Sequence, residues 1–539
     1  MLLLHLSLLN LALVVRSQVP IVTLDQATVI GVQNGTVEKF LGIPYAEPPV
    51  GDLRFKLPVN ISSYEQGINA TEYGFTCISQ NSTTNSDLID VVGSIAGDII
   101  GHNQTHTAQD EDCLTVNVIR PSNINGSLPV LVWIYGGGFE GGSSVQYDQM
   151  TTSIVSQSVE IGKPLVLVSM NYRVSAFGFI SSQEVQRANV SNIGLYDQRA
   201  ALHWVKRYIS AFGGNSSHVT IWGQSAGAIS ASLQMLAFDG NSEDLFHAAF
   251  MQSGSPIPVG NITGGQPYYD FLVSNTGCSG SNDTISCLRD VPLSNLTEAI
   301  NQTPGLFSYQ SLVLAWAPRV DGVFLTDLPQ RLIRKDKVAK IPVVSGNVDD
   351  EVEQNLISSQ YTILCMSDQE FREYVSTIWL PGASPQELEP LWEAYPSNPA
   401  DGSPFNTSFV SAITPQYKRM AAFQGDTVFQ APRRYFLHQQ AGKQPVWSYL
   451  SKRLKYLPIL GSFHASDLYL NLLNEYVIYF ANNFDPNTGN TTTWPQYTID
   501  SPDMLAFPPT TEGNITVIKD LYRVNPMQIL TNLSLKYPL

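Results

Sequence analysis

A serine in the turn Gly223-Gln224-Ser225-Ala226-Gly227 is the first feature of the sequence that could carry chemistry. The residues His218–Trp222 before it predict a strand, and Ala228–Leu236 after it predict a helix. A G-x-S-x-G turn in this setting exposes the serine oxygen as a nucleophile, and the helix N-terminus favours negative charge beside it. Ser225 is therefore the candidate nucleophile for acyl transfer. The alternative interpretation is a strand-to-helix turn without chemistry.

Such a serine needs donors for the oxyanion that forms on the attacked carbonyl. The apolar run Val130–Tyr135 predicts a buried strand, and it leads directly into Gly136-Gly137-Gly138-Phe139. Successive glycines let the backbone turn its amides toward a substrate. We expect the amides of Gly137, Gly138 and Ala226 to form the oxyanion hole. A flexible loop would be the alternative for an isolated glycine run.

The serine also needs a general base, usually a histidine oriented by a carboxylate. In folds with this elbow the chain order is serine, acid, histidine. His464 fits that order, because it lies in a loop beyond the predicted strand Val446–Leu450. His438 falls at the predicted end of a helix, where a cap or surface role is expected, and His247 follows the elbow too closely. We predict His464 as the base.

The candidate acids follow another predicted strand, Ile341–Ser345, in the segment Gly346-Asn-Val-Asp-Asp-Glu. Asp349, Asp350 and Glu351 stand together there. Any of the three could accept a hydrogen bond from a histidine Nδ1–H, so chemistry alone does not choose among them. A run of acids in a solvated loop is the alternative interpretation.

Apolar runs rich in β-branched residues recur along the chain and alternate with segments of helical character. They suit strands buried on both faces of a parallel or mixed sheet that helices cover. We predict one α/β catalytic domain over residues 18–539, with long insertions and no internal repeat. The predicted strands not yet named are Leu165–Asn171 and Ala249–Gln252.

Further motifs make the chain resemble the type-B carboxylesterase/lipase family, which is cholinesterase-like. The closest likeness is to extracellular fungal lipases and sterol esterases of the Candida rugosa type. The motifs run over nearly the whole chain after the first 25 residues. Besides the elbow, they are Phe40–Gly51, Glu111–Asn117, Tyr135–Glu140, Asn171–Val174, Ala211–Gly214, Met251–Gly254 and Leu460–His464.

The resemblance implies an α/β-hydrolase fold with a mixed, mainly parallel central sheet and a serine–histidine–glutamate triad. In the family the glutamate follows a glycine by five positions, which selects Glu351 after Gly346. Ser253 matches a family serine that supports the acid and the base. The chain departs from the family at Val352, where a glycine is usual, and at Gln224, where many members carry glutamate.

The five cysteines show no CxxC or Cys/His spacing typical of zinc, and no metal or cofactor is expected. Cys278 and Cys287 could close a small loop, and Cys77 and Cys113 a longer one; the resemblance implies both bridges. Cys365 would be left over as a buried thiol.

The loop 77–113 contains an amphipathic stretch in which apolar residues recur at helical spacing. The resemblance implies a mobile lid there, through which the protein could meet a lipid–water interface; a fixed surface helix is the alternative. After the acid, Gln354 and Asn355 are polar where related lipases tend to place aromatics, which leaves room for sterol, carotenoid or phenolic esters. The apolar positions are Leu88, Val91, Val92, Ile95 and Ile99.

The N-terminus indicates export. The apolar run Leu2–Val15 is too short to span a bilayer comfortably, and residues 1–17 resemble a signal peptide cleaved before Gln18, with an uncleaved anchor as the alternative. Sixteen Asn-X-Ser/Thr sequons, from Asn34 to Asn532, fit a secreted glycoprotein. A net charge of −16 would repel nucleic acid, so we expect no nucleic-acid partner.

We therefore expect a secreted serine carboxylic ester hydrolase that works through an acyl-enzyme on lipid-like esters, such as triacylglycerols or sterol esters. A short-chain, feruloyl-type or carotenoid-ester esterase is the alternative. A remote alternative is a non-catalytic adhesion relative. The sequence makes no prediction of the oligomeric state.

Overall fold

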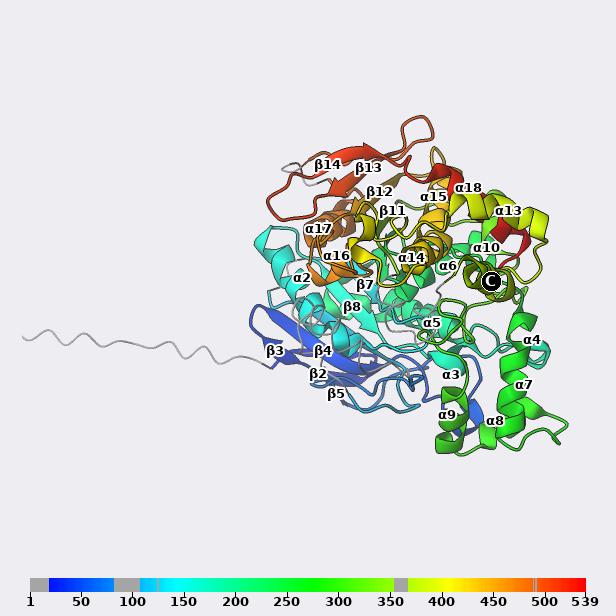
Figure 1. The fold of residues 1–539 in the computed structure, drawn as a ribbon. Helices are drawn as coiled ribbons and strands as arrows, with labels where there is room; N and C mark the ends of the chain where they lie inside the picture. The colour runs from blue at the N-terminus through cyan, green and yellow to red at the C-terminus, as the bar shows by residue number, and fades with distance from the viewer. Residues whose placement is uncertain (1–18, 82–106, 124–125, 353–366, 488, 490–491) are drawn as a thin grey trace, which may run out of the picture.

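The computed structural model describes residues 19–81, 107–123, 126–352, 367–487, 489 and 492–539. Strands from this part of the chain form one sheet in the order β14-β13-β12-β11-β10-β9-β7-β8-β6-β4-β3 (Figure 1). The strands from β13 to β8 run parallel to one another, whereas β14, β6, β4 and β3 pair antiparallel with their neighbours. The predicted mixed, mainly parallel sheet is confirmed. The strands are β3 Val32–Asn34, β4 Val37–Pro44, β6 Thr115–Pro121, β7 Leu128–Ile134, β8 Val166–Met170, β9 Gly214–Gln224, β10 Ala248–Gln252, β11 Val343–Val348, β12 Val446–Ser451, β13 Asp503–Phe507 and β14 Thr516–Lys519.

A small second sheet near the N-terminus contains β1 (Ile21–Leu24), β2 (Ala27–Ile30) and β5 (Ile68–Asn69). Burial alternates along β1 and β2, so every second residue points into the core. This alternation is typical of a sheet with one solvated face.

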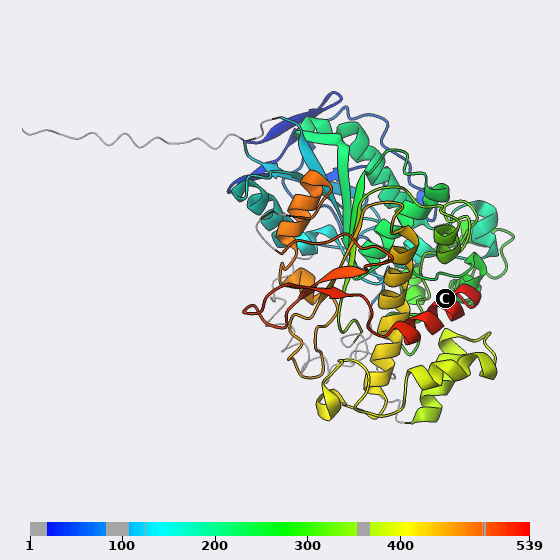
Figure 2. The ribbon, with the colours of Figure 1, turned by 90° about the horizontal axis from the view of Figure 1, so that it is seen from above.

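Helices cover both faces of the large sheet. In Figure 2 the orange helix α17 lies on one side of the central strands, and the teal to green helices α5 and α6 lie on the other. α17 packs on α2, and α5 packs on α6. The described helices are α2 Asp148–Glu160, α3 Ser175–Phe179, α4 Gln183–Ala188, α5 Ile193–Tyr208, α6 Ala226–Gly240, α7 Gln266–Asn275, α8 Thr284–Asp290, α9 Leu293–Asn301, α10 Pro329–Arg334, α12 Asp368–Tyr374, α13 Pro385–Ala394, α14 Tyr417–Gly425, α15 Ala431–Gln440, α16 Ser466–Tyr469, α17 Asn474–Asn483 and α18 Val524–Lys536.

The central strands are buried along nearly their whole length. All residues of β8, β10, β11 and β12 are buried, because helices cover the sheet on both sides. The register of these parallel strands brings their carboxyl ends to one edge. Gln224 of β9 lies opposite Gln252 of β10, which lies opposite Gly346 of β11. Residues that follow these strands therefore meet at one site.

Strand β11 differs from its prediction. It begins at Val343, two residues later than expected, and continues to Val348. Gly346 and Asn347 resemble loop residues, yet they pair with β12 in the parallel register. Strand β12 provides hydrogen bonds for their backbone groups, and this pairing cannot be read from the local sequence. The acidic segment therefore starts directly at the strand end.

Both predicted disulfides form, Cys77–Cys113 and Cys278–Cys287. The first closes the loop that contains the amphipathic stretch, and the second joins the end of α7 to α8. The residues 88–99 of that stretch, Cys365 and residues 1–17 lie outside the described residues. None of the described helices is long and apolar enough to cross a bilayer.

A buried ion cluster fastens α15 to the segment between β14 and α18. Arg433 Nη1 and Nη2 lie 2.9 and 3.0 Å from the two carboxylate oxygens of Asp520, and Arg434 Nη2 lies 2.6 Å from Oδ1. Burial alone would raise the pKa of Asp520, but the two guanidinium groups bring it well below its usual value. Removing one partner of such a cluster leaves an uncompensated charge in a dry interior.

We expect Asp520→Asn to lower the free energy of unfolding by about 3–5 kcal/mol, because two buried guanidinium groups lose their counter-charge. Denaturant unfolding at neutral pH measures this loss. The wild type should also lose this stabilisation below about pH 4, as the pH falls toward the depressed pKa of Asp520, and the variant should not. Asp327→Asn is the control, because Asp327 pairs with the largely exposed Lys335, and it should cost about 1 kcal/mol or less. Equal losses in the two variants would contradict the prediction.

Candidate active site

Ser225 lies between the end of β9 and the start of α6, in the predicted strand–turn–helix setting. Its backbone has φ 57° and ψ −127°, a combination that non-glycine residues rarely adopt. The surrounding structure holds it there. The Ser225 amide donates to the Gln252 carbonyl at 2.9 Å, and the Ile229 amide donates to the Ser225 carbonyl at 2.9 Å.

The turn is sharp enough to require glycine at position 227. A methyl group on Gly227 would lie 2.0 Å from the carbonyl oxygen of Ile134, at the end of β7. Backbone therefore passes against backbone, and no side chain fits between. This contact places the start of α6 directly over the neighbouring strand.

The predicted oxyanion loop follows β7 and touches the elbow. A methyl group on Gly136 would lie 2.9 Å from Ser225 Cβ. Gly137 has φ 120°, which favours glycine, and in the described part of the chain the amides of Gly137 and Gly138 have no hydrogen-bond partner. Ala226 opens α6, so its amide has no acceptor within the helix. The loop thus starts against the elbow, and the three predicted donors have unused N–H groups among the described residues.

The structure pairs His464 with Glu351. His464 Nδ1 lies 2.6 Å from Glu351 Oε2. The other carboxylate oxygen, Oε1, accepts from Asn347 Nδ2 at 2.8 Å and from the Val348 amide at 2.9 Å. Glu351 is buried, and these bonds fix the direction in which its carboxylate faces the imidazole. Asn347 was not among the predicted site residues, because its contact with Glu351 depends on the chain turning back at the end of β11.

Asp349 and Asp350, which the sequence left as possible acids, turn to a different partner. Lys455 Nζ lies 2.7 Å from Asp349 Oδ2 and 2.7 Å from Asp350 Oδ1. Asp350 Oδ2 also accepts from the Ser462 amide at 2.8 Å, two residues before His464. All three acids are buried, so the interpretation as a solvated loop is wrong.

The second imidazole nitrogen faces the elbow. His464 Nε2 lies 3.1 Å from Gln224 Nε2, on the residue before Ser225. Glu351 Oε1 already accepts two N–H bonds, so Oε2 is the oxygen that faces the imidazole, and it accepts from Nδ1 in the tautomer that carries its proton there. Gln224 then donates to an unprotonated Nε2. The Ser225 hydroxyl makes no hydrogen bond among the described residues.

The other histidines lie elsewhere. His438 is on α15 with its ring 5.8 Å from that of Tyr497, and His247 contacts Asp244 at the surface. Neither histidine contacts the elbow, which agrees with the prediction that neither is the base.

A buried polar chain that the sequence did not predict lies behind the pair. Asp467 Oδ2 accepts from Tyr449 Oη at 2.6 Å and from Gln252 Nε2 at 3.2 Å, and Gln252 in turn accepts from Trp222 Nε1 at 2.6 Å. Burial raises the pKa of Asp467. An acid three residues after His464 was the available signal.

Ser253 is buried between the elbow and β11, but its side chain makes no hydrogen bond to Glu351 or His464. Its amide donates to the Gly346 carbonyl at 2.9 Å, with φ 48°. Its hydroxyl has no hydrogen-bond partner among the described residues. Any support that Ser253 provides comes from its main chain in this structure.

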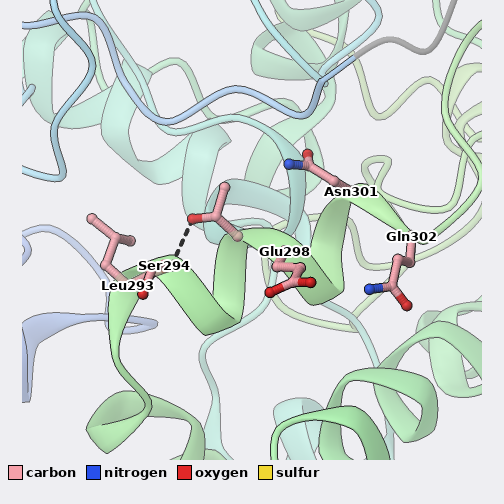
Figure 3. Close-up of a pocket in the computed structure, with 6 residues that line it drawn as sticks. Leu293, Ser294, Glu298, Asn301 and Gln302 are labelled. Atoms are coloured by element: carbon pink, nitrogen blue, oxygen red, sulfur yellow. Dashed lines mark hydrogen bonds between the residues drawn. The ribbon is translucent and has the colours of Figure 1, made fainter.

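A separate cavity of about 610 Å³ opens along α9. Figure 3 shows its labelled side chains along one face of that helix. None of them belongs to the elbow, the oxyanion loop or the acid–base pair. Its described lining residues are Leu293, Ser294, Thr297, Glu298, Asn301 and Gln302.

A model of the "Carboxylesterase family" matches residues 18–525. The chain belongs to this family. "Lipase 4" of Diutina rugosa is 41% identical over 88% of this chain and 88% of its own length. "Secreted lipase 1" of Botryotinia fuckeliana is 39% identical over 89% and 88%. The crystal structure of Aspergillus niger EstA superposes with a TM-score of 0.80 at 24% identity and covers 97% of this chain and 99% of its own.

This carboxylesterase-family chain therefore has the α/β-hydrolase fold and is a carboxylic ester hydrolase. Val352, where the family usually has glycine, is buried and lies beside Gly425 on α14, on which a methyl group would lie 3.4 Å from Val352 Cγ2.

We expect Gly227→Ala to lower kcat/KM for p-nitrophenyl butyrate by at least about 100-fold, because a misplacement of about 1 Å at a reacting centre has that effect. Steady-state kinetics and the thermal midpoint measure the change. Gly280→Ala is the matched control, since nothing lies within 4 Å of its added methyl group, and it should leave both unchanged. Wild-type kcat/KM in Gly227→Ala would show that the close contact with β7 is not needed.

Proposed function

We propose that this carboxylesterase-family enzyme is a secreted serine hydrolase that works through an acyl-enzyme. Ser225 is the nucleophile, His464 the general base and Glu351 the acid that orients it. The observation that carries the proposal is the Glu351–His464 pair, whose Nε2 faces the residue next to Ser225.

The hydrogen bonds of His464 suit a base. Glu351 accepts a hydrogen bond from Nδ1–H, which leaves Nε2 with a lone pair that can take the serine proton. For acylation the Ser225 hydroxyl replaces the Gln224 amide at Nε2. The serine oxygen then bonds to the ester carbonyl carbon as its proton passes to Nε2. His464 returns this proton to the departing alcohol, and a water repeats the sequence to release the acid.

The amides of Gly137, Gly138 and Ala226 stabilise the oxyanion in this proposal. They have no competing partners among the described residues, so they need no reorganisation when charge develops. Each such donor contributes about 3–4 kcal/mol to the transition state. Two come from the loop after β7 and one from α6, which makes the hole depend on the contact between the two.

A serine-directed phosphonate ester tests the mechanism. We expect it to abolish hydrolysis with one equivalent bound, and mass spectrometry of the peptide should place the adduct on Ser225. Ser225→Ala should resist labelling and keep the thermal midpoint. A folded wild type that stays unmodified, or an adduct on another serine, would count against the proposal.

We further propose lipid-like esters, such as triacylglycerols or sterol esters, as substrates. The names of the relatives support this, since "Lipase 4" and "Secreted lipase 1" match over most of the chain. The Cys77–Cys113 bridge closes the loop that contains the candidate lid, which would meet a lipid–water interface. The polar Gln354 and Asn355, which lie outside the described residues, count against a simple long-chain lipase and leave room for sterol esters or for the second candidate, a short-chain, feruloyl-type or carotenoid-ester esterase.

An ester panel separates these candidates. We expect kcat/KM to rise from two-carbon toward long acyl chains, and the rate on emulsified triacylglycerol or cholesteryl ester to increase above the solubility limit of the substrate. Tributyrin below and above saturation is the paired control. A preference for two- to four-carbon or feruloyl esters without an interfacial effect would favour the second candidate.

Secretion is part of the same proposal. Residues 1–17 would be removed as a signal peptide, leaving residues 18–539 as the catalytic domain. The sequons and the name of the relative "Secreted lipase 1" support export.

A further inference from the structure

A buried carboxyl group on the oxyanion loop has no described cation beside it. Glu140 lies two residues after Gly138 and is 6% exposed. Its Oε2 accepts from the Leu306 amide at 2.7 Å. Its Oε1 has no hydrogen-bond partner among the described residues. A carboxylate in this setting would carry a desolvated charge with one oxygen unsatisfied.

Gln80 carries a second unsatisfied acceptor and lies next to Glu140, since the Gln80 amide donates to the Glu140 carbonyl at 2.9 Å. Its side-chain Nε2 donates to the carbonyls of Ile300 and Thr303 at 3.2 and 2.9 Å, which fixes the orientation of the amide. Its Oε1 is buried and has no partner in the described chain. A methyl group on Gly305 would lie 3.2 Å from Glu140 Oε2, 3.5 Å from Gln80 Nε2 and 3.7 Å from Gln80 Cδ, so the two side chains border one small region.

A single proton on Glu140 Oε1 would give both unsatisfied oxygens a hydrogen bond. A neutral carboxyl group has an O–H to donate, and the Gln80 carbonyl oxygen is the acceptor without a partner. We propose that Glu140 acts in its neutral form as a positioning residue, which joins the oxyanion loop to Gln80 and to the segment that carries Leu306. This inference rests on the proposed function of Gly137 and Gly138 as oxyanion donors.

The electrostatic surroundings agree with a neutral group. Burial raises the pKa of Glu140 to about 8, although the Leu306 amide acts in the opposite direction. Of the elements in contact with it, the segment 79–81 and residues 300–306 carry no charged side chain, and α9 carries only Glu298, which is exposed. Beyond Phe139, Arg173 is bonded to Asp197 at 2.6 Å.

Glu140 is coupled to the oxyanion donors by short links. Its amide donates to the Gly137 carbonyl at 3.1 Å, and its carboxyl group holds Leu306, whose side chain lies 3.2 Å from a methyl group placed on Gly138. An ionised Glu140 would be repelled by the partial negative charge on the Gln80 carbonyl oxygen, and its side chain would move toward solvent. The loop that presents Gly137 and Gly138 would shift with it.

Three variants test this inference: Glu140→Gln, Glu140→Ala and the control Glu65→Gln at an exposed glutamate. We expect kcat for p-nitrophenyl butyrate in the wild type to fall as the pH rises through about 8, and Glu140→Gln to lack that decline. Glu140→Ala should lower kcat by about tenfold or more at pH 7 with little change in KM, and glutamine should restore it to within about threefold of wild type.

Thermal unfolding supplies a readout independent of catalysis. The native pKa of Glu140, about 8, exceeds that of an unfolded glutamate, about 4.3. Between these values the folded chain holds a proton that the unfolded chain has lost, so the stability of the wild type falls as the pH rises. Glutamine binds no such proton. The midpoint of Glu140→Gln should therefore rise relative to wild type from pH 5 to 8, and that of Glu65→Gln should not.

A midpoint difference that stays constant with pH would overturn the neutral Glu140. A pH-dependent difference together with an unchanged alkaline decline in kcat would overturn its positioning role. Phosphonate labelling at Ser225 separates these results from the proposed function: an unlabelled wild type would contradict the serine mechanism, while the unfolding data would still report whether Glu140 is neutral.

Discussion

The active site depends on one close approach of backbone to backbone, where Gly227 passes the carbonyl of Ile134. This contact lets α6 begin over the end of β7 and holds Ser225 at a φ of 57°. The strain is local, and the hydrogen bond from Ser225 to Gln252 on β10 maintains it. A side chain at position 227 would push α6 away from β7, and the nucleophile and its oxyanion donors would separate.

The parallel sheet brings the other parts of the site to this contact. Gln224, Gln252 and Gly346 lie side by side at one edge, so the elbow, the acid segment and the histidine loop meet although they are far apart in sequence. Buried charges hold these loops in distinct ways. Lys455 neutralises Asp349 and Asp350, and Asp350 fixes the loop that leads to His464. Among the described residues no such cation lies beside Glu140, so in our proposal protonation satisfies its buried carboxyl group.

Much of this site could be predicted from local patterns. The strand before the elbow, the helix after it and the loop position of His464 follow from hydrophobic periodicity and glycine placement, which are local properties. The end of β11 was predicted too early, because Gly346 and Asn347 continue the strand only through pairing with β12. Gln224 and Asn347 were not recognised as hydrogen-bond partners of the acid–base pair, since each acquires that contact by chain folding.

The sequence by itself determined the elbow, the glycine loop and the order of serine, acid and histidine, because these depend on residue types at short spacing. Residue chemistry alone left three adjacent acids equivalent, since all three can accept the same hydrogen bond, and only the family resemblance pointed to Glu351. The tertiary structure supplied the physical reason for the difference between them. The turn after Val348 directs Glu351 to His464, while a lysine more than a hundred residues later in the chain takes the other two. A carboxylate's partner is set by what the fold brings within hydrogen-bonding distance, and residue type alone does not contain that information.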